Sequence, residues 1–404
     1  MESWKFLWLL KRFNFLNILV LSFYYKPDLC AGSFRTSALV NELSKHKNVD
    51  IEVISTLPNR YASFSADALL FEESESVRVH RIALPSHKSG VLDQAKAFFY
   101  FYKNSMKIIK RKEYDVIYAT SSRLFTAFLA SRVSRKKKVP LYLDIRDIFV
   151  DTINDLLSDK VAFFARPVCS LVERYSFSKA QRINLVSAGF KGYFESRYPT
   201  TDFRWFTNGI DEEFLDCPDD VLCQAARSKL NVVYAGNIGD GQGLHEILPM
   251  LSYALKDTAH FTVIGDGSRQ SRLVDALKGN LNVTLLPPVN RQELIKEYKK
   301  ADVLFLHLND YSAFEKVLPS KIFEYAALGK PILAGVSGYA ARFLVEEVDN
   351  CGVFRPGDHI AAVQEFSRLS FKDINRESFK LKYSRKKIMR NMAADILGFV
   401  NYGG

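Results

Sequence analysis

The segment with the strongest chemical signal is rich in glycine. Residues Gly236 to Gly243 (GNIGDGQG) follow an apolar run and precede a helical pattern. Glycine is costly in chain entropy, so this density indicates backbone that approaches an anion closely. We predict that Gly236, Asn237, Gly239, Gly241 and Gln242 contact a phosphate. The spacing does not fit the G-x-G-x-x-G fingerprint, which disfavours a nicotinamide oxidoreductase.

A second segment, Leu318 to Tyr325 (LPSKIFEY), combines a helix start with opposite charges. Pro319 suits the first position of a helix, which places Ser320 and Lys321 in its first turn. Lys321 would offer a cation to a diphosphate, and Glu324, one turn later, could accept two hydrogen bonds from a ribose. A local Lys–Glu pair on a solvated helix face explains the same pattern, and the residues alone do not separate the two interpretations.

Two weaker signals lie in the first half of the chain. The loop Tyr24 to Ser33 follows the first strand and carries Gly32, where a phosphate or sugar could approach a helix start. Asp144, Arg146 and Asp147 crowd at the end of another apolar strand. An ordinary turn and a loop salt bridge, respectively, are the alternatives.

These segments are positioned by alternating strand and helix patterns. Each half reads as strand, loop, helix and strand, and most strands are apolar on both faces, which is typical of a parallel sheet covered by helices. The predicted strands are residues 17–23, 49–56, 115–119, 141–144 and 182–186 in the first half, and 231–235, 260–264, 283–286, 302–307 and 331–334 in the second.

The repeated pattern predicts two doubly wound α/β domains. We place an N-terminal extension at 1–15, the first domain at 16–212, a linker at 213–229, the second domain at 230–377 and a basic amphipathic helix at 378–404. The extension mixes Trp and Leu with Lys and Arg, and either an interfacial anchor or a segment covering the fold would account for it.

Charge is distributed unevenly along the 404 residues. Residues 1–200 hold 31 Lys and Arg against 19 Asp and Glu, whereas the remainder holds 25 against 26. The basic clusters at 103–112 and 132–138 would attract anionic lipid, although a solvated helix face explains them equally. No groove-reading motif accompanies them, which disfavours nucleic acid. The five cysteines are scattered, and no apolar run reaches about 18 residues. A cytoplasmic protein at the inner face of a membrane is expected.

Taken together, the chain resembles the family 4 retaining glycosyltransferases of the GT-B fold, closest to the branch acting in bacterial surface polysaccharide and O-antigen assembly. The resemblance covers about residues 16–400. It is carried by the runs LVLSFYYKPDLCAGSFRTSALVNEL, LYLDIRDIFVD, NGIDEEF, VVYAGNIGDGQGL, FTVIGDGSRQSRL, LPSKIFEYAALGKPILAG and NCGVFRPGD.

The resemblance implies that the second domain binds a nucleotide sugar and the first binds most of the acceptor. Glu324 matches the ribose-binding glutamate, but its usual partner glutamate is replaced by Lys316. The family's diphosphate-neutralising Arg and Lys fall at Asn237 and Gln242, so Lys321, loop amides, and Arg35 or Arg146 must supply that charge. The family's His-Asp pair appears as Arg146-Asp147.

Donor contacts are further expected at Gly32, Pro319 and Ser320, besides Lys321, Glu324 and the glycine segment. The resemblance implies a catalytic set of Lys321, Glu324, Asp147 and Arg146, and acceptor contacts at Arg35, Asp144 and Arg146. It favours a UDP-sugar donor, a polyprenyl-diphosphate-linked saccharide acceptor and catalysis without metal. A sugar-nucleotide epimerase on the same fold and a non-catalytic module at a membrane remain alternatives.

Overall fold

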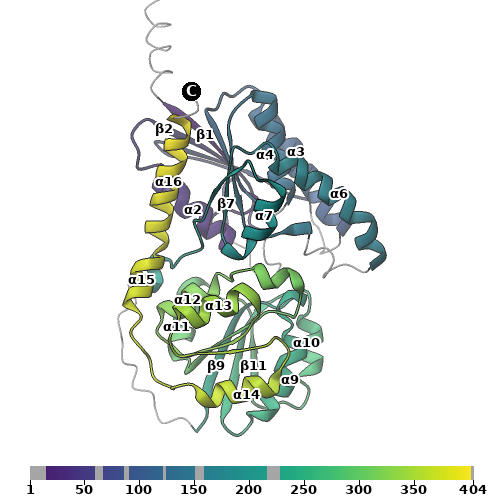
Figure 1. The fold of residues 1–404 in the computed structure, drawn as a ribbon, viewed down its shortest axis with the longest axis vertical. Coiled ribbons are helices and arrows are strands. Elements are labelled where there is room, and N and C mark those ends of the chain that lie inside the picture. Colours follow the sequence, from purple (N-terminus) through teal and green to yellow (C-terminus); the bar gives the residue numbers. More distant parts are fainter. Residues whose placement is uncertain are drawn as a thin grey trace, which may run out of the picture.

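The computed structural model describes residues 15–59, 67–85, 91–121, 124–150, 159–215 and 228–401. They form two α/β domains, drawn one above the other in Figure 1, and each is built around its own sheet. The predicted two-domain architecture with a helical C-terminal region is confirmed. Most of the predicted N-terminal extension and of the linker lies outside the described residues.

The first sheet has the strand order β3-β4-β2-β1-β5-β6-β7-β8 and is parallel except for β3. The apolar, β-branched run of β1 is buried on both faces, as expected for a central strand. The strands are β1 (Leu16–Leu21), β2 (Val49–Thr56), β3 (Phe71–Glu73), β4 (Val77–Ile82), β5 (Val116–Thr120), β6 (Leu141–Ile145), β7 (Arg182–Leu185) and β8 (Asp202–Arg204).

Helices cover both faces of this sheet. Leu19 and Leu21 of β1 point into one core and Ile18 and Val20 into the other, because side chains alternate along a strand. The first-domain helices are α2 (Ala31–Leu43), α3 (Val91–Ile109), α4 (Leu124–Lys137), α6 (Asp159–Phe177), α7 (Lys191–Arg197) and the short η1 (Ala188–Phe190).

The second sheet is wholly parallel, in the order β11-β10-β9-β12-β13-β14. Its strands are β9 (Leu230–Asn237), β10 (Ala259–Asp266), β11 (Val283–Leu286), β12 (Val303–His307), β13 (Ile332–Gly335) and β14 (Cys351–Phe354). Its helices are η2 (Asp240–Gln242), α9 (Leu244–Ala254), α10 (Gln270–Ala276), α11 (Arg291–Lys300), η3 (Ser312–Lys316), α12 (Lys321–Ala327), α13 (Gly338–Glu347) and α14 (His359–Arg368).

The chain crosses between the domains twice, at neighbouring points. Before the second domain, Ile210 accepts a hydrogen bond from the Arg385 amide (2.8 Å) and donates one to the Tyr383 carbonyl (2.8 Å). A side chain on Gly209 would meet Tyr383 and Arg385 backbone at 2.8 Å, so glycine permits this close crossing. The first crossing leads into α8 (Glu212–Leu215).

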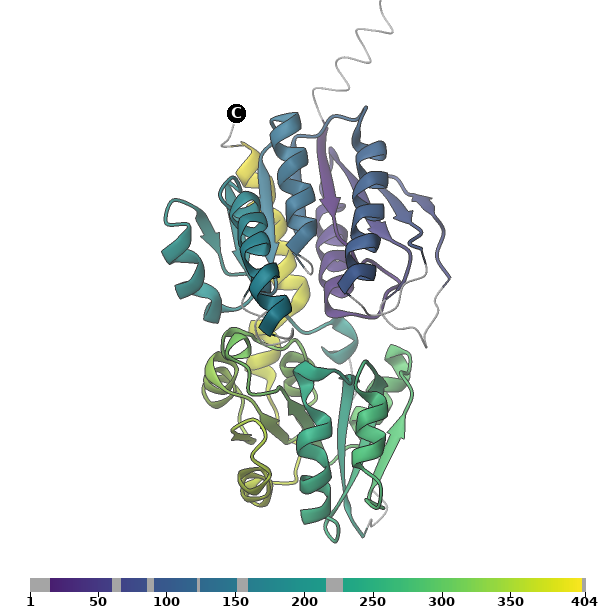
Figure 2. The same ribbon diagram turned by 90° about the vertical axis from the view of Figure 1, so that its right-hand side faces the viewer.

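The single C-terminal helix predicted from the sequence is divided at Ser384 into α15 (Glu377–Tyr383) and α16 (Arg385–Asn401). Figures 1 and 2 show that α16 runs from the junction along the first domain. Met389, Met392 and Ile396 of α16 are fully buried in that domain's core. Asp395 accepts hydrogen bonds from Tyr142 (3.0 Å), Arg182 (2.9 Å) and Arg204 (2.9 Å), which ties α16 to three strands.

Candidate active site

A pocket of about 150 Å³ lies between the two domains, at the carboxyl ends of β1, β9 and β10. Ligands of doubly wound sheets bind at this edge. The second domain supplies most of the lining, including four residues predicted as donor-binding: Gly236, Ser320, Lys321 and Glu324. The first domain contributes the β1–α2 loop and the start of α2.

The glycine segment and the start of α12 meet in this pocket. The backbone of Gly236 has a φ of +151°, and a side chain there would overlap the Lys321 ammonium. The same ammonium lies 5.3 Å from the centre of the Tyr234 ring, a cation–π distance. Gly265 of β10 lies so near Gly236 that a Cβ would strike the Gly236 carbonyl. Glycine at both positions therefore lets Lys321 reach the backbone of the strand ends.

The resemblance expects charged residues at positions 237 and 242, but here Asn237 and Gln242 are hydrogen-bonded to each other. The Asn237 Nδ2 donates to Gln242 Oε1 at 2.7 Å, and neither side chain lines the pocket. Gly239, Gly241 and Pro319, also predicted to bind the donor, are not among the lining residues either.

The buried side chain of His307, which was not predicted from the sequence to have a role, holds the glycine segment in place. Nδ1 of His307 bonds the Gln242 carbonyl (2.7 Å), and Nε2 accepts from the Gly357 amide (3.0 Å). Burial lowers the pKa of His307 to about 4, so the ring is neutral and can accept and donate at once. His307 positions the segment and takes no part in the pocket lining.

Glu324 lies at the back of the pocket and is almost fully buried. Burial raises the pKa of Glu324, and Arg291, whose Nη1 lies 3.5 Å from Oε1, opposes that rise. Arg291 favours the charged form of Glu324, and a charged carboxylate is a strong acceptor for hydroxyl groups. The predicted ribose contact therefore has a suitable geometry and electrostatic partner.

Arg291 is a lining residue that was not predicted from the sequence. It begins α11 and pairs with Asp211, with Glu213 (2.6 Å) and with Glu324. Its guanidinium also lies 4.3 Å from the centre of the Phe34 ring on α2. The available signal was Asn290, whose side chain caps α11 by accepting from Glu293 (3.0 Å) and thereby marks Arg291 as the first helical residue.

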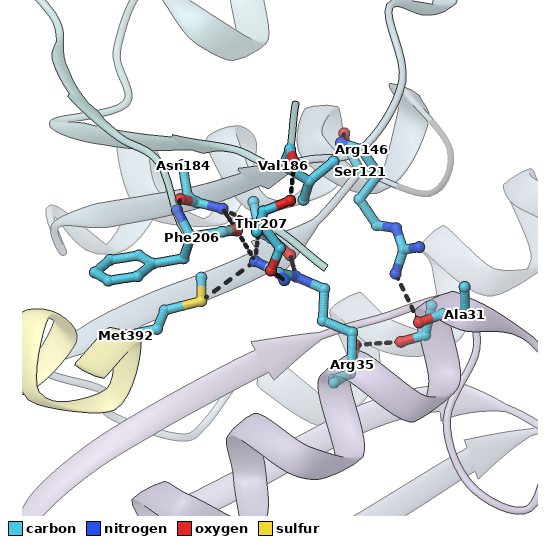
Figure 3. Close-up of polar contacts among 12 residues, drawn as sticks. Ala31, Arg35, Ser121, Arg146, Asn184, Val186, Phe206, Thr207 and Met392 are labelled. Carbon is cyan, nitrogen blue, oxygen red and sulfur yellow. Dashed lines mark hydrogen bonds and ion pairs between the residues drawn. The ribbon is translucent and has the colours of Figure 1, made fainter. Parts of the chain in front are cut away.

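The structure corrects the predicted acceptor contacts at Arg35 and Asp144. Both side chains are fully buried, and they pair through two hydrogen bonds of 2.7 and 2.9 Å. Figure 3 shows that Arg35 also donates to the carbonyls of Phe206 and Thr207, each at 2.7 Å. Burial alone would raise the pKa of Asp144, but Arg35 holds it below its ordinary value. With no exposed surface, this pair joins α2 to the interdomain chain and cannot touch an acceptor.

The other first-domain candidates support the pocket wall. Nη1 of Arg146 donates to the carbonyl of Ala31 (2.9 Å), a lining residue, as drawn in Figure 3. Burial, followed by the neighbouring Arg35, lowers the pKa of Arg146. Gly32 is buried in the first turn of α2, and Asp147 is exposed. None of the three residues Gly32, Arg146 and Asp147 is part of the lining.

The site can therefore bind a diphosphate and a diol in one pocket, through Lys321, strand-end backbone and Glu324. Residues 229–370 match the family described as "Glycosyl transferases group 1". The chain is a glycosyltransferase. No curated protein matches this glycosyltransferase over its sequence.

Solved structures show that the glycosyltransferase has the GT-B fold. Sucrose-phosphate synthase from Thermosynechococcus elongatus aligns with a TM-score of 0.72 at 13% identity, covering 96% of this chain and 100% of that one. HepE from Anabaena, in complex with UDP and glucose, aligns with a TM-score of 0.66 at 15% sequence identity, covering 95% of this chain and 100% of that one. WaaG, described as involved in lipopolysaccharide biosynthesis, aligns with a TM-score of 0.63 at 12% sequence identity, covering 93% of this chain and 95% of that one.

Proposed function

We propose that this enzyme moves a hexosyl or N-acetylhexosaminyl group from a UDP-sugar to a polyprenyl-diphosphate-linked saccharide during surface polysaccharide synthesis. The observation that carries the donor side is the convergence of Gly236, Lys321 and Glu324 in one interdomain pocket. HepE, whose structure holds UDP and glucose, and WaaG, of lipopolysaccharide biosynthesis, support the choice of donor and process.

In the proposed reaction, the bond between the sugar's anomeric carbon and the diphosphate breaks as the acceptor oxygen attacks. Negative charge grows on the leaving diphosphate, and preorganised donors aimed at that charge lower the barrier most. In this proposal, Lys321 and the amides at the end of β9 take this role, and Glu324 holds the ribose. We assign no protein nucleophile. The leaving phosphate takes the acceptor's proton, and the sugar retains its anomeric configuration.

The donor assignment is tested by replacing Lys321 with alanine. Turnover should fall by about 10²- to 10³-fold, because one charge-stabilising donor is lost. Melting temperature should remain close to that of the wild type, since Lys321 is only partly buried. Lys278→Ala, on an exposed side chain of the second domain, is the matched control. Unchanged turnover in Lys321→Ala would remove the phosphate assignment.

A thermal-shift panel identifies the nucleotide, because a ligand that binds only the folded state raises apparent stability. UDP should stabilise the enzyme more than GDP or ADP at equal concentration. Incubation with a UDP-sugar and no acceptor addresses the epimerase alternative, which requires an isomerised sugar nucleotide to appear. Stabilisation by none of the three nucleotides would contradict the proposal.

The same proposal places the enzyme at an anionic membrane, and α3 supplies a surface for it. Lys96, Phe99, Tyr100, Lys103 and Lys107 share one exposed face of the helix. Phe99 is 66% and Tyr100 45% exposed. Aromatic groups beside lysines suit a lipid interface with anionic headgroups. No helix in the described part of the chain is both long and apolar enough to cross a membrane.

The membrane contact is tested with vesicles of phosphatidylcholine alone or with phosphatidylglycerol. Wild-type enzyme should sediment with the anionic vesicles. Each lysine near a surface contributes about 1 kcal/mol, and a buried Phe about 1.5–3 kcal/mol. Phe99→Ser with Lys103→Gln and Lys107→Gln should therefore weaken binding more than 100-fold. Leu281→Ser with Lys278→Gln, in the second domain, is the control. Equal sedimentation of both variants would argue against α3.

A further inference from the structure

The two domains also meet at η1 and η3, two short helices on opposite sides of the domain boundary. The buried hydroxyl of Ser187, which caps η1, donates to the carbonyl of Lys316 at the end of η3 (2.5 Å). A side chain on Gly189 of η1 would overlap the same carbonyl, so glycine permits this approach. Val317, the next residue, packs against the core of the first domain. The first domain therefore holds two consecutive residues of the second.

This contact lies directly before the donor-binding end of α12. Only two residues separate Val317 from Ser320, and Lys321 follows. Ser320 and Lys321 both line the donor pocket. Of the two linking residues, Leu318 is buried in the core of the second domain, and Pro319 has a φ angle fixed by its ring. Because this link is short and stiff, a displacement of Val317 is passed on to Lys321.

η3 is also closely packed on its other sides. A Cβ on Gly241 of the glycine segment would come within 2.9 Å of the Phe314 ring. A Cβ on Gly338, which has a φ of +58° at the start of α13, would overlap the carbonyl of Glu315. Three consecutive residues of η3 are thus each approached by a glycine of a different element. Packing this close leaves η3 little room to shift unless its neighbours shift too.

We propose that Ser187 and Gly189 of the first domain are positioning residues for the donor diphosphate, because by holding η3 they fix the place of Lys321. The inference rests on the proposed function, in which Lys321 and the glycine segment bind the diphosphate. It adds that this part of the donor site is complete only while η1 is docked on η3. Lys316, which replaces the expected partner of Glu324, takes part through its backbone carbonyl and is not a lining residue.

The test is a double-mutant cycle on UDP affinity, measured by calorimetry with the full chain. Gly189→Ala should weaken UDP binding about tenfold, because the added methyl group displaces the Lys316 carbonyl and with it Lys321. In a Lys321→Ala background the same substitution should change UDP affinity less than about twofold, since it acts through an ammonium that is absent. Gly192→Ala is the matched control, because Gly192 lies on the adjoining α7 and has open space around it.

A second variant tests the same contact without adding bulk. Ser187→Ala removes the hydrogen bond to the Lys316 carbonyl and should weaken UDP binding about threefold. This loss should also disappear in the Lys321→Ala background. Thermal melts of all the variants establish that they are folded, and Ser187→Ala decides the question if Gly189→Ala does not fold.

The outcomes separate this inference from the proposed function. Equal UDP affinity in Gly189→Ala and Gly192→Ala overturns the inference. An equal loss with and without the Lys321 ammonium also overturns it, because η1 would then be only a structural contact between the domains. In both cases the donor assignment stands as long as Lys321→Ala itself weakens UDP binding. If Lys321→Ala binds UDP as tightly as the wild type, the phosphate assignment fails and the inference fails with it.

Discussion

Arg291 lies where both domains and the interdomain chain meet. It pairs with carboxylates on α8 and α12 and stacks on a ring of α2. Arginine suits this position because its planar guanidinium can serve several carboxylates and an aromatic face together. The pKa of Glu324 thus depends on a residue that also contacts the first domain.

Removing Arg291 should change the pH at which nucleotide binds. The pKa of Glu324 is already raised by burial, and Arg291 is the largest effect that lowers it. In Arg291→Gln the pKa rises further, so Glu324 takes up a proton at higher pH and stops accepting from the ribose. The acidic limb of UDP affinity, measured by calorimetry from pH 5 to 8, should move to higher pH. If the acidic limb of UDP affinity did not move, the protonation of Glu324 would not control nucleotide binding.

At the scale of residues, the sequence predicts the groups in the pocket but not the residues that hold them in place. Gly236 could be predicted because it lies at the carboxyl end of a strand, and Lys321 and Glu324 because they lie in the first turn of a helix. Arg35 and Asp144 also lie near such ends, and their types suggested a binding role. These two side chains are buried by α16 and by the interdomain chain, both of which are far away in the sequence. The local sequence pattern around Arg35 or Asp144 therefore does not reveal the burial.

At the scale of elements, the end of β9 and the start of α12 form one unit. Gly265, at the neighbouring end of β10, allows this arrangement, since any side chain on it would strike the Gly236 backbone. His307 of β12 then holds the turn that follows β9. Three neighbouring strand ends therefore fix the position of Lys321.

Gly236→Ala tests whether this unit is required. The new methyl group would overlap the Lys321 ammonium, and the backbone φ of +151° disfavours alanine. We expect UDP affinity to fall more than tenfold. Gly279→Ala is the control, because Gly279 also has a positive φ (+94°) but has open space around it. Retained affinity in Gly236→Ala would show that Lys321 can move without loss.

Most strands were predictable because their apolar runs are short and bounded by turn residues. The predicted strands 49–56 and 283–286 agree with β2 and β11 to the residue. The β3–β4 hairpin was not predicted, since FEE is exposed and carries no alternating pattern. The division of the C-terminal helix at Ser384 was also missed, because it is imposed by the pairing of that residue with Ile210.

At the scale of the whole molecule, the buried Arg35–Asp144 pair joins parts of the chain that are distant in sequence. Arg35 lies on α2, Asp144 on β6, and the carbonyls they help to hold lead into the second domain. Met392 of α16 lies 3.6 Å from Arg35 as well. The pair is thus a structural joint of the first domain.

Arg35→Met should destabilise the first domain by about 3–5 kcal/mol, because it leaves Asp144 buried without its cation. Adding Asp144→Asn should recover part of that loss. Urea unfolding of both variants measures the effect, and UDP binding reports on the second domain. A stable Arg35→Met variant with a weakened acceptor would instead restore the acceptor role that the sequence suggested.

The position of α16 has a consequence for how the protein is made. Met389, Met392, Ala393 and Ile396 complete a core that begins with Ile18 of β1. During synthesis, the ribosome releases residues 16–204 long before these side chains exist outside it. Domains usually fold in order from the N-terminus, but here the first domain must wait for the last helix. The second domain, whose core includes Phe379 and Tyr383 of α15, is complete before α16 begins. A chain truncated before residue 385 should therefore hold a folded second domain beside an unfinished first one.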